Sequence, residues 1–147
     1  MIIDRVFNFD IKYNKSHFPI EFALGEDHKS LEIYFNYSPT LVPRETSACQ
    51  SLECIKRYAP NKINDKNFLD LDTVELVNII TLSLFQEGEY IGVRHSGDLP
   101  QLLVISEDRS SLGFLKRKIS KGNYTIKLNI HNVLSPVRVK LQVRAEK

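Results

Sequence analysis

Strict alternation of apolar and polar residues is the feature that most constrains how this chain can fold. Apolar residues occupy every second position at 18–22, 31–37, 124–130 and 137–143, with polar or charged residues between them in most of these segments. Successive side chains of a β-strand point to opposite faces of a sheet, so each segment predicts an antiparallel strand with one buried face. The alternation is cleanest in the last two segments, which we expect to form a hairpin-like pair.

Two segments form nearly continuous apolar runs, at 79–85 and 102–105. Such runs are typical of strands that are covered on both faces, so both predict central strands. Glycine-containing turns at 87–89, 96–98 and 121–123 separate the strands.

One segment follows a helical period instead. Apolar residues recur three or four positions apart in a run that ends before Pro60: Ala48, Leu52, Ile55 and Tyr58. This spacing predicts a short amphipathic helix near residues 44–59, inside an excursion between two strands. Seven to nine short strands with one inserted helix predict an all-β fold, a two-sheet antiparallel sandwich of jelly-roll type.

Composition limits the class of protein. The chain has 147 residues, of which 42% are hydrophobic, enough for a single β-sandwich domain over residues 1–147 without disulfides or metal. Twenty basic residues balance 18 acidic ones, so the bulk charge of +2 predicts neither nucleic-acid nor membrane binding. Charges at Asp4, Arg5 and Asp10 interrupt the apolar start, which argues against a signal peptide and for a cytoplasmic protein.

The metal-ligating residue types are scattered. Cys49 and Cys54 are five positions apart, about 8 to 9 Å on a helix, which is beyond disulfide reach. We expect both to be reduced thiols on half-buried side chains. The four histidines lie in separate segments, at His17, His28, His95 and His131. No second ligand pair is present to complete a tetrahedral site, so we predict no metal and no cofactor.

No catalytic constellation stands out. Residues 94–98 combine the residue types of a nucleophile, a base and an acid, but neighbours in sequence seldom form a triad, and we interpret this cluster as a turn. Two carboxylate pairs, Glu45 with Glu53 and Asp70 with Asp72, are open alternatives that we interpret as solvated charges. We therefore predict no catalytic residues.

Basic residues gather near the end of the chain. Lys127, Arg138, Lys140 and Arg144 are the outward residues of the last two strands, with further basic residues at 116–118 and at Lys121. Single-stranded nucleic-acid platforms place aromatic rings between such charges, and none occurs between these. We interpret the stripe as a solvated face that discourages edge pairing. Outward-facing Tyr34 is one candidate for a sugar-stacking ring.

Four motifs occur in a recognisable order. An apolar strand at 78–85 is followed by Ile91-Gly92-Val93-Arg94-His95, by Leu112-Gly113-Phe114, and by Gly122-Asn123-Tyr124-Thr125-Ile126. This order resembles the N-terminal β-sandwich of bacterial PHP-type metal-dependent hydrolases, the polymerase and histidinol phosphatase superfamily. The resemblance extends over about residues 17–143. It departs from the family where an Asp-Pro pair is lost in the turn at 85–88 and where Tyr124 replaces a tryptophan.

The resemblance implies a non-catalytic accessory or interaction domain. In the family a catalytic domain with a His-x-His pair follows the sandwich, and this chain contains no such pair. The implied partner is a metal-dependent hydrolase domain, or a second copy of the chain, and any hydrolase activity would reside outside this chain. This hypothesis predicts an exposed apolar patch with a polar rim on one sheet or on the helix.

Fold analogy suggests an alternative, a carbohydrate- or small-ligand-binding jelly-roll module. It predicts a groove with at least two exposed aromatic rings. The family also tends to place histidines where His95 and His131 occur. We interpret each imidazole as a hydrogen-bonding partner of a loop backbone at the edge of the sandwich, and a groove that both residues line is the alternative.

Overall fold

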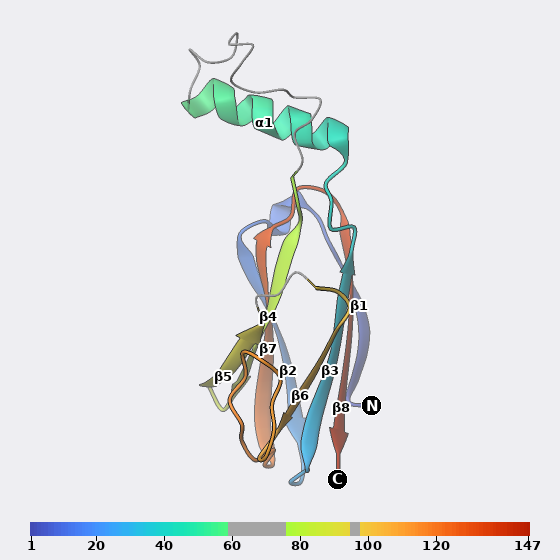
Figure 1. Cartoon of the computed structure of the whole chain (residues 1–147), viewed down its shortest axis with the longest axis vertical. Coiled ribbons are helices and arrows are strands. Elements are labelled where there is room, and N and C mark those ends of the chain that lie inside the picture. The colour runs from blue at the N-terminus through green and yellow to red at the C-terminus, as the bar shows by residue number, and fades with distance from the viewer. Residues whose placement is uncertain (59–75, 95–97) are drawn as a thin grey trace.

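The chain forms a sandwich of two antiparallel sheets (Figure 1). The computed structural model describes residues 1–58, 76–94 and 98–147, without the side chains at positions 48, 50, 51, 54, 55 and 58. The elements in chain order are β1 (Ile3–Phe9), a 3₁₀ turn η1 (Ile11–Tyr13), β2 (Ser16–Leu24), β3 (Ser30–Ser38), α1 (Arg44–Tyr58), β4 (Ile79–Gln86), β5 (Glu89–Arg94), β6 (Gln101–Ser106), β7 (Gly122–Asn132) and β8 (Val137–Glu146). One sheet has the strand order β1-β8-β3-β6 and the other β2-β7-β4-β5. The predicted all-β sandwich is confirmed.

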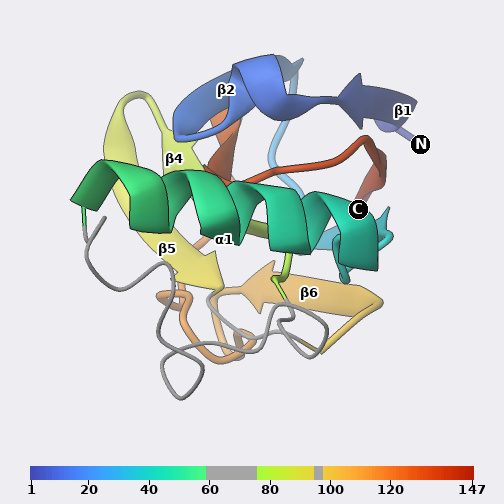
Figure 2. The ribbon, with the colours of Figure 1, turned by 90° about the horizontal axis from the view of Figure 1, so that it is seen from above.

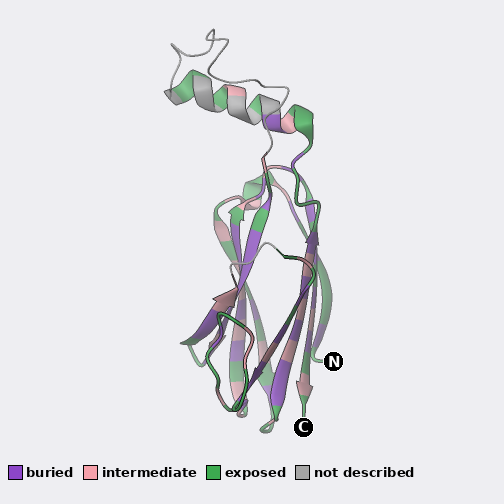
Figure 3. Ribbon diagram, in the orientation of Figure 1, coloured by how far each residue is buried: buried purple, intermediate pink, exposed green. Residues whose placement is uncertain are grey.

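The alternating segments place their apolar residues between the sheets. Leu31, Ile33 and Phe35 of β3 are fully buried, as are Ile126 and Leu128 of β7. The intervening residues face outward, which gives the strands their striped burial pattern in Figure 3. Four aromatic rings in edge-to-face and stacked contacts fill the side where β1 and β2 lie opposite each other: Phe7, Phe9, Tyr13 and Phe18.

The chain crosses between the sheets at nearly every connection. Among the strands of the described residues, only β4 and β5 are consecutive and pair with each other. Their turn contains Glu87 and Gly88, with φ of 49° and 79°. The predicted hairpin of the last two alternating segments is therefore wrong, because β7 pairs with β2 and β4 while β8 pairs with β1 and β3. The buried residues Val133 and Ser135 turn the chain across the sandwich edge between them.

The two continuous apolar runs behave differently. β4 is a central strand between β7 and β5, and most of its residues are buried on both faces, as predicted. Within residues 1–58, 76–94 and 98–147, β6 pairs only with β3. It is therefore an edge strand, and the prediction of a central strand is wrong there. Its outward residue Leu102 is 65% exposed, because nothing among the described residues covers that face of the edge.

The helix lies beyond one end of the sandwich, at the opposite end from the two termini (Figures 1 and 2). α1 agrees with the predicted helix near 44–59, except that residue 59 lies outside the described residues. Asn78, which is 1% exposed, lies where the chain returns from the helix to the sandwich, and its side chain connects three segments there. Its amide donates to Pro39 O and Ser135 Oγ, each at 3.1 Å, and its Oδ1 accepts from Leu134 N at 3.0 Å. Among the described residues, no helix is long and apolar enough to cross a membrane.

Candidate functional site

The structure shows where most of the candidate metal-ligating and catalytic residues lie. Across residues 1–58, 76–94 and 98–147, no three His, Cys, Asp or Glu side chains lie close enough to hold a metal ion. Cys49 is a free thiol and is exposed on α1, so the expectation of a half-buried side chain is wrong for it. His95, Ser96, Asp70 and Asp72 lie outside the described residues, and so does the proposed shared groove of His95 and His131. Glu45 and Glu53 are solvent-exposed on α1.

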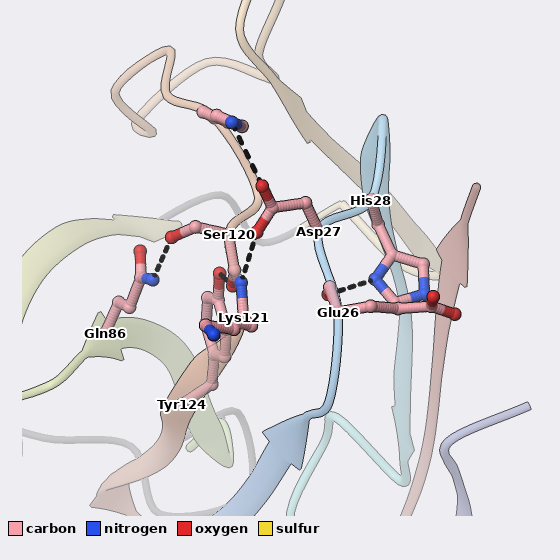
Figure 4. Close-up of polar contacts among 8 residues, drawn as sticks. Glu26, Asp27, His28, Gln86, Ser120, Lys121 and Tyr124 are labelled. Carbon is pink, nitrogen blue, oxygen red and sulfur yellow. Dashed lines mark hydrogen bonds and ion pairs between the residues drawn. The ribbon is translucent and has the colours of Figure 1, made fainter.

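Charged side chains gather at the end of the sandwich that carries the C-terminus (Figure 4). In the turn between β2 and β3, Asp27 accepts a hydrogen bond from Lys121 N at 2.8 Å and pairs with Lys118 Nζ at 3.0 Å. These contacts hold the pKa of Asp27 below its usual value, mainly through the Lys121 N–H, and raise the pKa of Lys118. Glu26 and Lys147 pair at 2.6 Å, which lowers the pKa of Glu26 and raises that of Lys147.

The same end of the sandwich has a hollow of about 620 Å³, lined by Asp27, His28, Lys29, Glu107, Asp108, Lys118 and Lys147. Two of its lysines, Lys118 and Lys147, are paired with carboxylates of the protein, Asp27 and Glu26. The His28 imidazole contacts the carbonyl of Glu26 at 2.9 Å. These contacts join the turn between β2 and β3 to the segment 118–121 and to the C-terminal Lys147, and we interpret the hollow as structural.

A second group of contacts supports this end from within (Figure 4). The Tyr124 hydroxyl donates to Ser120 O at 2.7 Å, and Gln86 Nε2 donates to Ser120 Oγ at 2.7 Å. Burial raises the pKa of the Tyr124 phenol. The ring of Tyr124 stacks on Phe22, with the planes 12° apart. Tyr124 is therefore a core residue with one polar contact.

The outer face of the β1-β8-β3-β6 sheet carries an apolar patch. Tyr34 of β3 lies directly opposite Leu102 of β6, and Met1 lies beside them at 60% exposure. These three residues are called the β3–β6 patch below. With the polar rim of Glu32, Gln142 and Arg144 they surround a hollow of about 230 Å³. An edge strand with an exposed leucine and a neighbouring tyrosine is a surface on which another protein can dock.

The predicted basic stripe is divided between opposite faces of the molecule. Arg138, Lys140 and Arg144 are exposed on β8, on the same outer face as the β3–β6 patch. Lys127 belongs to β7 in the other sheet, where its ammonium lies 4.9 Å from the centre of the Phe85 ring. The prediction of one continuous stripe is wrong, because it assumed that β7 and β8 are neighbours.

The outer face of the β2-β7-β4-β5 sheet carries a polar network. Three polar residues there are almost completely buried: Thr81 at 4%, Ser83 at 7% and Asn129 at 8% exposure. Asn129 Nδ2 donates to Thr81 Oγ1 at 3.2 Å and to Ser83 Oγ at 2.6 Å. The network continues to His17 Nδ1, 2.8 Å from Asn129 Oδ1, and to His131 Nε2, 2.8 Å from Thr81 Oγ1. The His17 and His131 rings are the exposed ends of this network.

Sequence reasoning missed this network. Period-two alternation places Asn129 and His131 on one face of β7, and the same pattern places His17 on the outer face of β2. The signal that was lacking is the pairing of β2 with β7, which brings together residues 112 positions apart.

Comparison with known proteins adds no relative. No protein-family model matches the chain, and no curated protein matches it in sequence. Any function must therefore be argued from the surfaces described above.

Proposed function

We propose that this β-sandwich is a non-catalytic accessory domain that docks on a partner protein through the β3–β6 patch. The observation that carries the proposal is Leu102, which is 65% exposed on an edge strand directly opposite Tyr34. When a partner covers such a side chain, the complex is stabilised by about 25 cal/mol for each Å² of apolar surface removed from water.

The charged residues around the patch indicate which charges a partner surface should carry. Arg138, Lys140 and Arg144 project from β8 next to the patch, while Glu32 lies on its rim. A complementary surface would have an apolar centre and acidic groups on the side that meets β8. The sequence resemblance suggests the catalytic domain of a PHP-type metal-dependent hydrolase as this partner.

The carbohydrate-binding alternative has less support. On the outer face of the second sheet Tyr90 is 49% exposed, but Phe85 is partly buried and lies under Lys127. The planes of the two rings differ by 67°, so they do not form the flat platform on which a sugar ring stacks. A protein-docking role is the stronger hypothesis.

Sedimentation velocity with a purified PHP-type catalytic domain from the same genome tests this proposal. We expect the parent chain to form a 1:1 complex, and Leu102→Glu to weaken it at least tenfold because a charge would be buried at the interface centre. Leu112→Glu is the matched control, since Leu112 is 83% exposed on a loop outside the patch. Equal binding by both variants, or no binding by the parent, would contradict the proposal.

Two further measurements separate the alternatives. Association of the parent chain alone, abolished by Leu102→Glu, would replace the hydrolase with a second copy of the chain as the partner. The intact mass of the polypeptide in its native cell distinguishes a partner on a separate chain from a partner domain on the same polypeptide. A mass near 17.0 kDa would mean that the partner is a separate chain, and a much larger mass would place it on the same polypeptide.

A further inference from the structure

The polar network on the β2-β7-β4-β5 sheet fixes which atom of His17 carries a proton. Asn129 uses its amide N–H groups on Thr81 and Ser83, so its Oδ1 can only accept from His17 Nδ1. The neutral His17 ring therefore has its proton on Nδ1 and a lone pair on Nε2. Nε2 lies on the other side of the ring from the network and is available as a hydrogen-bond acceptor.

A hollow of about 190 Å³ adjoins this ring, lined by Lys15, Ser16, His17, Ile130 and His131. None of these lining residues is acidic. Lys15 and His17 line the same small space, and their side chains can supply a positive charge and an acceptor atom there.

Lys15 occupies a backbone position that disfavours lysine. Its φ of 60° lies in the left-handed region, which glycine and asparagine adopt more readily. Its neighbours hold the turn in place: Asn14 Oδ1 accepts from Val133 N at 2.8 Å, and the Ser16 hydroxyl donates to Tyr13 O. Residues in sparsely populated backbone regions cluster at binding sites, so this turn is a candidate for one.

We propose that this hollow binds a small phosphate oxyanion that retains one P–OH group. Lys15 Nζ donates to a charged phosphate oxygen, and His17 Nε2 accepts the proton of the P–OH group. His131, held by Thr81, forms a wall of the hollow. The arrangement predicts discrimination against sulfate, which has the same charge as hydrogen phosphate at pH 8 but has no hydroxyl to donate.

The test is a titration of the whole chain with inorganic phosphate at pH 8, followed by the imidazole resonances in ¹H–¹³C NMR spectra. We expect the His17 and His131 signals to shift and saturate, while His28 at the C-terminal end of the sandwich does not respond. Sodium sulfate at the same ionic strength should give no saturable shift. Saturation by sulfate at the same concentrations, or an equal response of His28, would overturn the proposal.

A pair of variants tests the role of Lys15. Lys15→Asn removes the charge but keeps a residue that accepts the left-handed backbone, so the fold is retained and the affinity for phosphate should fall at least tenfold. Lys140→Asn removes the same charge from the opposite sheet and should bind phosphate as the parent does. Equal affinity of the two variants would show that Lys15 is not part of a site.

Discussion

The register of single residues decides whether this sandwich can fold. Leu141 of β8 is fully buried between the sheets, while the preceding Lys140 is exposed on the outer face. An aspartate at position 141 would bury a charge without a partner, at a cost of several kcal/mol, on the order of the whole stability of a domain.

We therefore expect Leu141→Asp to be unfolded at 25 °C in far-UV circular dichroism and in urea titration, and Ile126→Asp in β7 to behave in the same way. Lys140→Asp is the control and should remain folded. A cooperatively folded Leu141→Asp or Ile126→Asp protein would show that the register described here is incorrect.

Asp27 gives the chain a pH-dependent contact. Its pKa is lowered in the folded protein, so its contribution to stability is complete above its ordinary value of 3.8 and is lost as the pH falls through the lower, folded value. The pKa of its partner Lys118 is raised in the folded protein. The contribution of Lys118 to stability is therefore complete below pH 10.5 and is lost as the pH rises through the higher, folded value.

We expect Asp27→Asn to lower the urea midpoint slightly at pH 7, and the difference from the parent to close below pH 3.8. Glu21→Gln, at an exposed position of β2, is the control and should have little effect at either pH. A difference that persists unchanged in acid would assign the effect to something other than the Asp27 charge.

At the scale of elements, a glycine contact holds the loop after β6 against β5. A Cβ on Gly92 would lie 2.3 Å from Gly113 O and 2.6 Å from Phe114 Cα, both backbone atoms. This close approach allows the bond from Leu115 N to Ile91 O at 2.9 Å. The loop therefore lies along β5, the edge strand of its sheet.

We expect Gly92→Ala to lower the free energy of unfolding by about 1–3 kcal/mol, because backbone must move to relieve the overlap. Faster amide exchange at Leu115 should accompany it. Gly25→Ala, where no heavy atom lies within 4 Å of the new Cβ, should change stability by less than about 0.5 kcal/mol. Equal effects of the two substitutions would contradict the packing described for the loop.

At the scale of the whole molecule, the sequence predicts which residues are buried better than it predicts which strands pair. Alternation identified the inward residues of β3, β7 and β8, because the two-residue period of a strand is local. Alternation carries no information on which strands pair, so it predicts a hairpin of β7 and β8 although these strands lie in different sheets. The candidate surfaces depend on this missing information.

Both candidate surfaces are assembled across strands. The β3–β6 patch requires Tyr34 and Leu102 to be cross-strand neighbours, and the phosphate hollow requires His17 to meet Asn129. Each residue alone has an ordinary structural interpretation. The accessory-domain hypothesis predicts an apolar patch on one sheet and the alternation predicts that Tyr34 faces outward. The position of the patch does not follow from the sequence, because the apolar run at 102–105 predicts a covered strand for Leu102.

The first and last strands are antiparallel neighbours, with Ile3 opposite Val143 and Phe9 opposite Val137. Both ends of the chain consequently leave the molecule on the same side, as Figure 1 shows. A force that pulls the ends apart would load these hydrogen bonds in succession from the Ile3 end instead of all together. If the domain is tethered through its two ends, it should yield to tension at low force, by peeling apart one hydrogen-bonded pair at a time.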